Sequence, residues 1–440
     1  MTDSKTFVGF ESKIPPEVLD RIFGHCERHY GHLGTFTFLP KSRLHPLLLV
    51  CKRWHSIAER RLYMCVSIGS DRNIKSKDGK GTTIWWRDVC KRFCESVETN
   101  PRLASLVREL HLSGTSEAEI EDHERRIRIM NSCKNVEKLI HITWEPSLFD
   151  ELKAALAKPD LTSLDLFASS DSTMETRFSP STLISLLRNW PRIQSVSATL
   201  GREEYDDGSG DLYLDDYGDT DLPLATGACP SLRAFSIEGE FFKPFQMKYL
   251  SDVAPNLEAI DIIVHTGCNK ASLRQNLQVW SPSLKKLRVR GYFPHTPFSD
   301  EGCPIISSPF PHLRSLDMGA PLINPSAMRF LPALEKLRFF GQYSYGVELA
   351  RLLNNGAMPC LNEIAVTLLW PEYEPSASDK KACLDIGKEL RRVCGKRSIP
   401  VQIREDSAKS RYTALMNSEG RWDGSDEDQT EPSDNDWPDW

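Results

Sequence analysis

The sequence predicts an α/β protein that has a small N-terminal helical module, an irregular solenoid with a parallel sheet, and a disordered acidic tail. Three observations predict this fold. Apolar residues near the N-terminus recur every three or four positions, which is typical of helices. Downstream, a short strand-like motif recurs at intervals of 21 to 39 residues. Residues 417–440 hold nine acidic residues and one basic residue, with almost no aliphatic side chains.

Composition limits the class of protein. With 440 residues, 40% of them hydrophobic, the chain can bury a sizeable core. A formal charge of -6 and a pI near 6.0 do not predict a nucleic-acid partner, and no apolar run is long enough to predict a membrane span. The twelve cysteines form no CxxC pair, no glycosylation sequon occurs, and residues 1–14 lack the apolar core of a secretory signal. We therefore expect a cytoplasmic or nuclear location.

Two helical patterns make up the N-terminal module. The first helix begins at Ile14-Pro15-Pro16-Glu17, because prolines suit the first turn of a helix. Residues 24–45 interrupt the pattern and predict a loop. Residues 47–63 predict a second helix. The apolar stripes of these helices consist of Val18, Leu19, Ile22 and Phe23 in the first and of Val50, Trp54, Ile57, Ala58 and Leu62 in the second.

The next segment connects the module to the repeats. Residues 69–82 are rich in Gly, Lys and Asp and predict a flexible connector. Residues 83–99 predict a helix that lays an aromatic-rich stripe against the first repeat. This stripe contains Trp85, Val89, Phe93 and Val97, which recur at every fourth position.

The repeated motif has apolar residues at its first, fourth and sixth positions, usually with proline two residues ahead of the first. Eight clear copies begin at Leu161, Ile193, Leu232, Leu257, Leu284, Leu313, Leu334 and Leu361. Looser copies begin at Val107, with Leu110 and Leu112, and at Val136, with Leu139 and Ile142. The spacing is close to that of leucine-rich repeats, so each unit should be a short strand with a helix or loop behind it.

Segments between and after the repeats complete the prediction. Segments such as residues 182–187 and 349–353 have the pattern of backing helices, and the acidic residues 203–221 predict a protruding loop. The last helix is expected at residues 381–394 and the last strand at residues 399–403.

The N-terminal motifs resemble the F-box. The segments that carry the resemblance are Ile14-Pro15-Pro16-Glu17-Val18-Leu19-Asp20-Arg21-Ile22-Phe23, Leu48-Leu49-Val50-Cys51-Lys52-Arg53-Trp54-His55-Ser56-Ile57-Ala58 and Arg60-Arg61-Leu62-Tyr63. The repeats look like the bodies of F-box proteins from fungi. Residues 24–45 depart from the family, because this stretch is longer than usual, and they leave the docking geometry open. The alternative interpretation is an ordinary helical cap on the first repeat.

The resemblance implies a non-catalytic subunit of a Skp-cullin-F-box (SCF) ubiquitin ligase. It implies that the F-box docks on a Skp-type adaptor and through it on a cullin, while the body binds an unidentified protein substrate without a cofactor or metal. By position, the adaptor-binding residues are Ile14, Pro15, Val18, Leu19, Ile22, Leu48, Leu49, Val50, Trp54, Ile57 and Leu62. The resulting division is an F-box at 14–68, a linker and helix at 69–99, a leucine-rich-repeat-like domain at 100–404 and an acidic tail at 405–440.

The fifth position of each repeat should point to the exposed face of the sheet, because side chains alternate along a strand. In four successive copies this position holds Asp261, Arg288, Asp317 and Arg338, so their charges alternate in sign. One interpretation is a charge ladder that stabilises neighbouring strands. The other is a site for an acidic or phosphorylated segment of a substrate. This candidate substrate site comprises Lys286, Arg288, Arg290, Lys336 and Arg338.

Other groups of polar residues carry weaker signals. Cys90 and Cys94 with His111 lack a fourth ligand at metal spacing, so core packing is the expected role of the cysteines. The acidic run at residues 206–211 lacks the order of an EF-hand and predicts a solvated loop. The tail tryptophans Trp422, Trp437 and Trp440 could form a short binding motif, although a solubilising end is favoured.

Three functions remain open at this point. The first is a substrate receptor of a ubiquitin ligase. The second is an F-box repeat scaffold that binds proteins without delivering them for ubiquitination. The third is an enzyme, for which no motif of a known catalytic class is legible.

Overall fold

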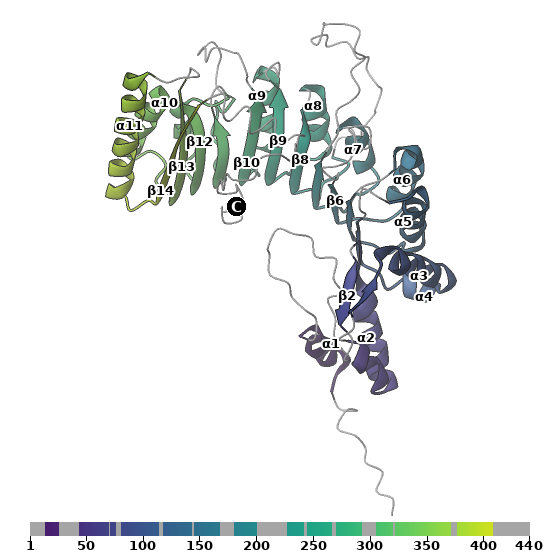
Figure 1. Cartoon of the computed structure of the whole chain (residues 1–440). Coiled ribbons are helices and arrows are strands. Elements are labelled where there is room, and N and C mark those ends of the chain that lie inside the picture. Colours follow the sequence, from purple (N-terminus) through teal and green to yellow (C-terminus); the bar gives the residue numbers. More distant parts are fainter. Residues whose placement is uncertain are drawn as a thin grey trace, which may run out of the picture.

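The computed structural model describes the chain in thirteen segments between residues 14 and 407. These segments are 14–25, 44–69, 71–75, 81–113, 118–142, 145–167, 180–199, 227–241, 244–265, 270–292, 305–319, 322–370 and 376–407. Two helices, α1 (Pro16–Gly24) and α2 (Lys52–Met64), lie with the 3-10 helix η2 (His45–Leu49) at one end of a long curved sheet (Figure 1). We call these three elements the N-terminal module.

The repeat body, from β1 to β14, is built on one parallel sheet of twelve strands in chain order. The strands are β1 (Cys65–Ile68), β4 (Glu109–Leu112), β5 (Lys138–Ile142), β6 (Ser163–Phe167), β7 (Ser195–Thr199), β8 (Ala234–Phe241), β9 (Ala259–His265), β10 (Lys286–Tyr292), β11 (Ser315–Gly319), β12 (Lys336–Gln342), β13 (Glu363–Trp370) and β14 (Val401–Ser407). The predicted α/β fold is confirmed in this respect, and all ten predicted repeats contain a strand.

Helices run behind the strands (Figure 1). They are α3 (Trp86–Thr99), α4 (Pro101–Ala104), α5 (Ile120–Ser132), α6 (Phe149–Leu156), α7 (Pro180–Leu187), α8 (Pro244–Val253), α9 (Lys270–Trp280), α10 (Tyr343–Asn354) and α11 (Ala377–Lys396), with 3-10 helices η3 (Pro146–Leu148) and η5 (Pro325–Phe330). Helices α7 and α10 lie where the sequence predicts backing helices. Loop 203–221 and residues 408–440 of the expected tail lie outside the described residues.

The core follows the predicted positions of the repeat. In the copy that begins at Leu284, the first, fourth and sixth residues are Leu284, Leu287 and Val289, and all three are buried. Leu287 pairs in register with Ile260 on one side and with Leu316 on the other. The buried residues of successive units therefore form one continuous core, since each unit covers the apolar face of its neighbour.

Two buried tryptophans connect neighbouring units. The indole Nε1 of Trp190 donates a hydrogen bond of 2.9 Å to the carbonyl of Leu156, the last residue of α6. Trp280, at the end of α9, donates one of 2.7 Å to the carbonyl of Ala254, directly after α8. The last carbonyls of a helix lack partners within that helix. Each tryptophan therefore fills core volume and also satisfies a helix end in the preceding unit.

Several predicted elements are wrong in their bounds. The helix expected at residues 47–63 is divided into η2 and α2, because Cys51 is extended and its sulfur accepts a 3.5 Å hydrogen bond from the amide of Trp54, which caps α2. The expected connector at residues 69–82 contains an antiparallel hairpin of β2 (Arg72–Lys75) and β3 (Gly81–Ile84). The last strand extends through residues 405–407, so these three residues belong to the sheet and not to a tail.

Two predicted side-chain orientations are also wrong. Helix α3 begins at Trp86, and its buried face contains Trp86 and Cys90, whereas Trp85 is exposed. In β5 the sixth position of the motif is His141, which is buried and pairs with Leu166, whereas the sequence predicts Ile142 for this position. The sequence around β5 misleads because isoleucines flank His141 on both sides, so apolar residues alone do not identify the buried face.

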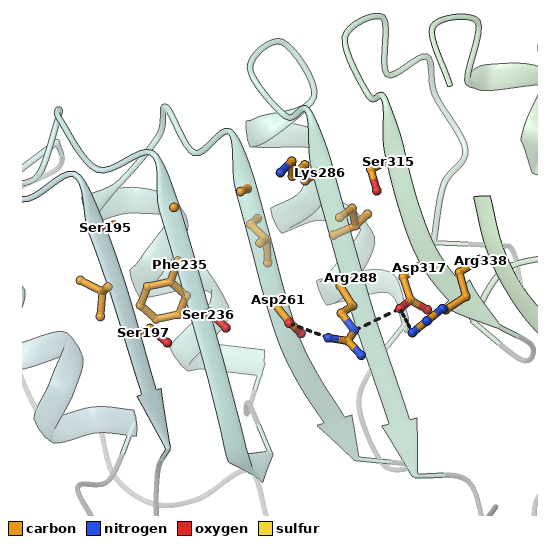
Figure 2. Close-up of a pocket in the computed structure, with 15 residues that line it drawn as sticks. Ser195, Ser197, Phe235, Ser236, Asp261, Lys286, Arg288, Ser315, Asp317 and Arg338 are labelled. Carbon is orange, nitrogen blue, oxygen red and sulfur yellow. Dashed lines mark hydrogen bonds and ion pairs between the residues drawn. The ribbon is translucent and has the colours of Figure 1, made fainter. Parts of the chain in front are cut away.

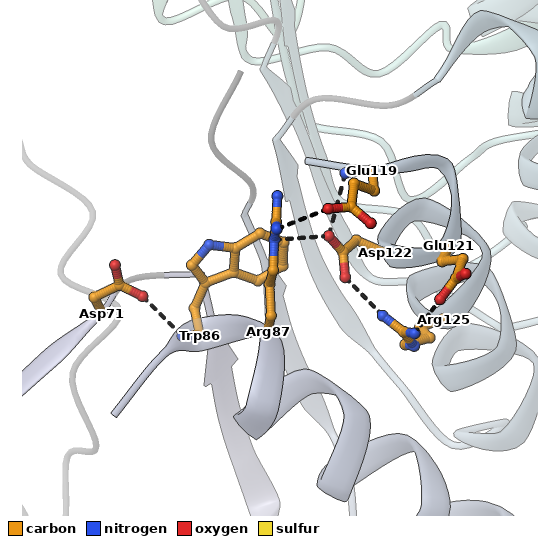
Figure 3. Close-up of polar contacts among 7 residues, drawn as sticks. All are labelled: Asp71, Trp86, Arg87, Glu119, Glu121, Asp122 and Arg125. Atoms are coloured by element: carbon orange, nitrogen blue, oxygen red, sulfur yellow. Dashed lines mark hydrogen bonds and ion pairs between the residues drawn. The ribbon is translucent and has the colours of Figure 1, made fainter. Parts of the chain in front are cut away.

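Charged residues join α3 to α5. Asp122 on α5 is buried and lies between Arg87 on α3, at 3.1 Å, and Arg125, at 2.8 Å (Figure 3). The guanidinium of the buried Arg126 lies 5.0 Å from the centre of the Trp86 ring. The backbone amide of Trp86 in turn donates to Asp71 at 2.8 Å. These contacts fix the N-terminal end of the repeat body, because a buried charge is stable only when it has partners.

Two buried histidines near this network have depressed pKa values. Burial, followed by the charges of Arg126 and His123, lowers the pKa of His141 to about 3. Burial, followed by the charge of Arg126, lowers the pKa of His123 to about 4, although Asp122 opposes the shift. Both side chains are therefore neutral in the folded protein at neutral pH, whereas a histidine in the unfolded chain binds a proton near pH 6.5.

We expect the free energy of unfolding to decrease as the pH falls below about 6.5 toward 4, because the unfolded chain then binds more protons than the folded protein. Each histidine contributes at most about 1.4 kcal/mol per pH unit in this window. Urea denaturation across the range measures the slope. His141→Leu should reduce it, and substitution of the exposed His312 by Gln should not. Equal slopes for the His141 variant and the unmodified protein would contradict this account.

Candidate functional site

The N-terminal module exposes apolar side chains that a small domain usually buries. Val18 and Ile22, one turn apart on α1, are both exposed. At the junction of η2 and α2, the side chains of Leu49 and Val50 are 89% and 48% exposed. Clustered apolar exposure on a soluble module marks a surface that a partner can cover. We call these four residues the module surface.

The predicted adaptor-binding residues divide into surface and core. Pro15 is exposed together with the four residues of the module surface. Leu19 and Ile57 are buried in the small core of the module. The remaining predicted residues are partly buried against that core, and they are Ile14, Leu48, Trp54 and Leu62. The structure therefore brings all eleven into one module, although buried residues can act on a partner only by supporting the surface.

The set of predicted adaptor-binding residues leaves out part of this core. Phe23 packs edge to face on Trp54, with ring centres 5.2 Å apart, and is fully buried. Leu44, directly before η2, is also fully buried. Phe23 belongs to the predicted apolar stripe, but Leu44 follows an irregular stretch that carries no periodic signal.

Ion pairs hold the two helices of the module together. Asp20 on α1 contacts Arg60 at 2.7 Å and Arg61 at 2.8 Å, both on α2. Desolvation raises the pKa of Asp20, but the hydrogen bonds from Arg61 and Arg60 outweigh it, so the pKa lies below its usual value. The guanidinium of Arg53 also donates to the carbonyl of Ile14. These contacts fix α1 against α2 and with it the module surface.

Polar and aromatic contacts join the module to the repeat body. Glu59 on α2 accepts two hydrogen bonds of 2.8 Å from Arg102 on α4, and these bonds, followed by the charge of Arg102, hold the pKa of Glu59 below its usual value. The rings of Tyr63 and Phe93 stack with centres 6.4 Å apart. Strand β1 begins at Cys65, the residue after the end of α2.

The predicted charge ladder is present on the exposed face of the sheet. Arg288 lies between two aspartates and contacts Asp261 at 3.4 Å and Asp317 at 3.1 Å (Figure 2). Arg338 contacts Asp317 at 3.5 Å. Register pairs Arg288 with both aspartates and Asp317 with Arg338, so the fifth positions lie directly across from one another. The predicted alternation is confirmed.

A groove of about 270 Å³ extends over β7 to β12, and all four residues of the ladder are among those that line it. Over β7 and β8 the groove has room because the outward positions of these strands hold small side chains such as Ser195, Ser197 and Ser236. Arg288 and Lys286 line it on the side of the ladder (Figure 2). The serines supply hydroxyl groups, and the three basic residues of the lining exceed its two aspartates by one charge, so the groove favours an extended acidic segment.

The five predicted substrate-site residues lie on β10 and β12, on either side of β11, and nearby carboxylates offset part of their charge. Arg290 contacts Asp261 at 3.2 Å, and Lys336 contacts Glu363 at 3.0 Å. This region therefore holds five basic groups and three carboxylates, which belong to Asp261, Asp317 and Glu363. Lys286 is exposed at the rim of the groove. A positive surplus of two charges remains.

Replacement of Arg288 and Arg338 by alanine tests the ladder. Asp261 keeps its contact with Arg290, and each partly exposed pair contributes about 0 to 1 kcal/mol. We therefore expect a decrease of about 1 kcal/mol in the free energy of unfolding, measured by urea denaturation. If the groove is a substrate site, capture of the bound protein should also fall at least tenfold. A large loss of stability with capture intact would assign the ladder to the fold alone.

The predicted core role of the two α3 cysteines agrees with their surroundings. Cys90 and Cys94 are buried, and burial raises the pKa of the Cys90 thiol to about 11 and also raises that of Cys94. Protonated thiols are poor metal ligands. His111 lies instead beside Glu109 and Cys65, residues that sequence spacing did not connect with it.

Comparison with known proteins identifies the module. Residues 12–68 match the family model described as F-box-like. A search of curated proteins gives no match to the chain. None of the helices in the described ranges combines the length and apolar content needed to cross a lipid bilayer. The matched residues include α1, η2 and α2 and end with β1, so the F-box-like domain and the repeat body share one strand.

Proposed function

We propose that this chain, whose residues 12–68 form an F-box-like domain, is the substrate-recognition subunit of an SCF ubiquitin ligase. In this proposal the module docks on a Skp-type adaptor and through it on a cullin, and the repeat body binds a protein substrate. The observation that carries the proposal is the exposed apolar surface on the matched domain. F-box domains commonly bind Skp-type adaptors, and such a surface needs a covering partner.

The proposed adaptor contact centres on the four residues of the module surface. Val18 and Ile22 share one face of α1, and Leu49 and Val50 project from the corner that begins α2. Apolar anchors of this kind dominate the energy of an interface when a partner removes water from them. The core residues Leu19 and Ile57 would keep the anchors in position.

The proposed substrate contact is the groove that the charge ladder lines in part. Small serines on β7 and β8 leave room for a backbone, while Lys286 and Arg288 provide positive charge at one side. We infer that the segment bound there is acidic or phosphorylated. The repeat body would belong to the leucine-rich-repeat type found in F-box proteins of fungi, and the protein would act in the cytoplasm or nucleus.

In this function the chain catalyses no reaction itself and needs no cofactor to connect a substrate to the ligase. F-box domains are typically non-catalytic, and ubiquitin transfer would be carried out by other subunits. The proposed partners include neither nucleic acid nor a membrane. The second candidate function is a scaffold, in which the same module binds the adaptor but the bound protein is not ubiquitinated.

Two measurements separate these functions. Purification of the full chain from cells should recover a Skp-type adaptor and a cullin. Proteins captured by the body should then be stabilised when the cullin is inhibited or when the module surface is mutated. Capture of the adaptor without any cullin-dependent change in the half-life of bound proteins would favour the scaffold. Failure to recover a Skp-type adaptor would overturn both the substrate-receptor function and the scaffold function.

A further inference from the structure

A second candidate site lies where the N-terminal module meets the repeat body. Cys65 on β1 and Glu109 on β4 are partners in register, and so are Ser67 and His111 two residues further along the same strands. Residues two positions apart point to the same face of a strand. The four side chains therefore gather on one face at the β1 end of the sheet, away from the groove over β7 to β12.

The ligand atoms of three of these residues are close enough for one metal ion. The Cys65 sulfur, a Glu109 carboxylate oxygen and a His111 ring nitrogen all lie within 4.8 Å of one another. Nε2 of His111 is 2.7 Å from Oε1 of Glu109. The side chains of His111 and Glu109 are only 12% and 29% exposed, so the surroundings are partly shielded from solvent.

Ser67 holds the imidazole in place from the other side. Its hydroxyl lies 3.1 Å from Nδ1 of His111, so the two ring nitrogens contact different residues. Histidines that ligate metals are usually oriented by a hydrogen bond at the second ring nitrogen. Ser67 provides such a bond, which is an observation independent of the clustering of the three ligands.

We propose that Cys65, Glu109 and His111 bind a zinc ion, with Ser67 as a positioning residue. A thiolate and an imidazole favour zinc over magnesium or calcium, which prefer oxygen ligands. Zinc binding releases the thiol proton of Cys65 to solvent and replaces the contact between His111 and Glu109 by two bonds to the metal. The proton on Nε2 of His111 moves to Nδ1, which then donates to the Ser67 hydroxyl. Three protein ligands are the number used in zinc sites that take an exchangeable fourth ligand.

The same residues could also suggest a serine hydrolase, because Ser67, His111 and Glu109 form a chain of contacts. In serine hydrolases the serine hydroxyl contacts Nε2 of the histidine and the carboxylate contacts Nδ1. Here the order is reversed, because Ser67 contacts Nδ1 of His111 and Glu109 contacts Nε2. The cysteine also has no role in such a chain. The zinc site uses all three ligand groups and is therefore the better account.

The site has a structural consequence that does not depend on the proposed ubiquitin-ligase function. Cys65 directly follows α2, whereas Glu109 and His111 belong to the next strand of the sheet. A zinc ion would thus connect the end of the F-box-like domain to the repeat body. It should raise the unfolding temperature of this junction, because a ligand that binds only the folded state stabilises it.

Zinc content and cobalt spectroscopy test the proposal on the full chain. We expect one zinc ion per chain after gel filtration, measured by elemental analysis, and an absorption band from thiolate-to-cobalt charge transfer when Co²⁺ replaces zinc. Cys65→Ser and His111→Gln should each weaken zinc binding about 100-fold, and Ser67→Ala should weaken it about tenfold. Circular dichroism identifies variants that remain folded.

Cys360→Ser is the matched control, because Cys360 is exposed and lies outside the cluster. This variant should keep the zinc content and the cobalt spectrum of the unmodified chain. Zinc that remains in Cys65→Ser and His111→Gln but disappears in Cys360→Ser would overturn the assignment. A cobalt complex of the unmodified chain without thiolate absorption would also overturn it, whether or not any variant folds.

Discussion

Replacement of both Leu49 and Val50 by aspartate should abolish capture of a Skp-type adaptor and leave the unfolding temperature nearly unchanged. Both side chains are exposed in the isolated chain, so their replacement removes little core packing. In the proposed complex they are covered, and an introduced carboxylate would lose its hydration. Loss of an interface anchor contributes about 2 kcal/mol or more, which is roughly a 30-fold change in Kd for each position.

The comparison variant is Val347→Asp, which places the same charge on a valine that is 56% exposed on α10. It should bind the adaptor as well as the unmodified chain does. Leu19→Ala is a poorer test, because Leu19 is buried and its loss would destabilise the whole module. Surface plasmon resonance with purified adaptor measures the difference. Equal binding by the double variant and the control would refute the module surface as the docking site.

Trp280→Ala should decrease the free energy of unfolding by about 3 to 5 kcal/mol, the usual effect of removing a large buried side chain. The change leaves a cavity between α9 and its neighbours and also removes the donor that satisfies the carbonyl of Ala254. Trp280→Phe keeps much of the ring volume, so about 1 to 3 kcal/mol is expected from the unsatisfied carbonyl. Denaturant unfolding measures both variants.

The control for this series is Trp85→Phe, because Trp85 is exposed at the start of α3. A surface substitution of this kind should change stability by less than about 0.5 kcal/mol. The order of stability should be unmodified chain, Trp280→Phe, then Trp280→Ala. If Trp280→Phe were as stable as the unmodified chain, the indole hydrogen bond would have no role in joining the units.

Repetition made most of the fold predictable. The proline and the three apolar positions recur in each clear copy, so the strand, its buried face and its outward residues follow from one pattern. Asp261, Arg288, Asp317 and Arg338 could therefore be placed side by side without a structure. Their individual contacts could not be predicted, because the position of the Arg288 guanidinium between two aspartates depends on the rotamer of its side chain.

Elements that lack the repeat were missed. Strand β1 consists of Cys65, Val66, Ser67 and Ile68, which lie next to a helix and have no preceding Pro-x-Leu pattern. Without β1 there is no register between Cys65 and Glu109, so the cluster around His111 could not be recognised. The hairpin of β2 and β3 is formed largely by polar residues, whose pattern resembles that of a connector.

The uninterrupted passage from α2 into β1 has a consequence for how a bound protein would be presented. Met64 ends the helix and Cys65 begins the strand, so no hinge residue separates them. In the proposed complex, the groove would therefore keep a fixed orientation and distance relative to the docked adaptor. If the chain serves the proposed ubiquitin ligase, ubiquitin should reach only those substrate lysines that lie within a small region around the docked complex. Which lysine is modified would then depend on where it lies on the substrate's surface more than on the residues next to it in the chain.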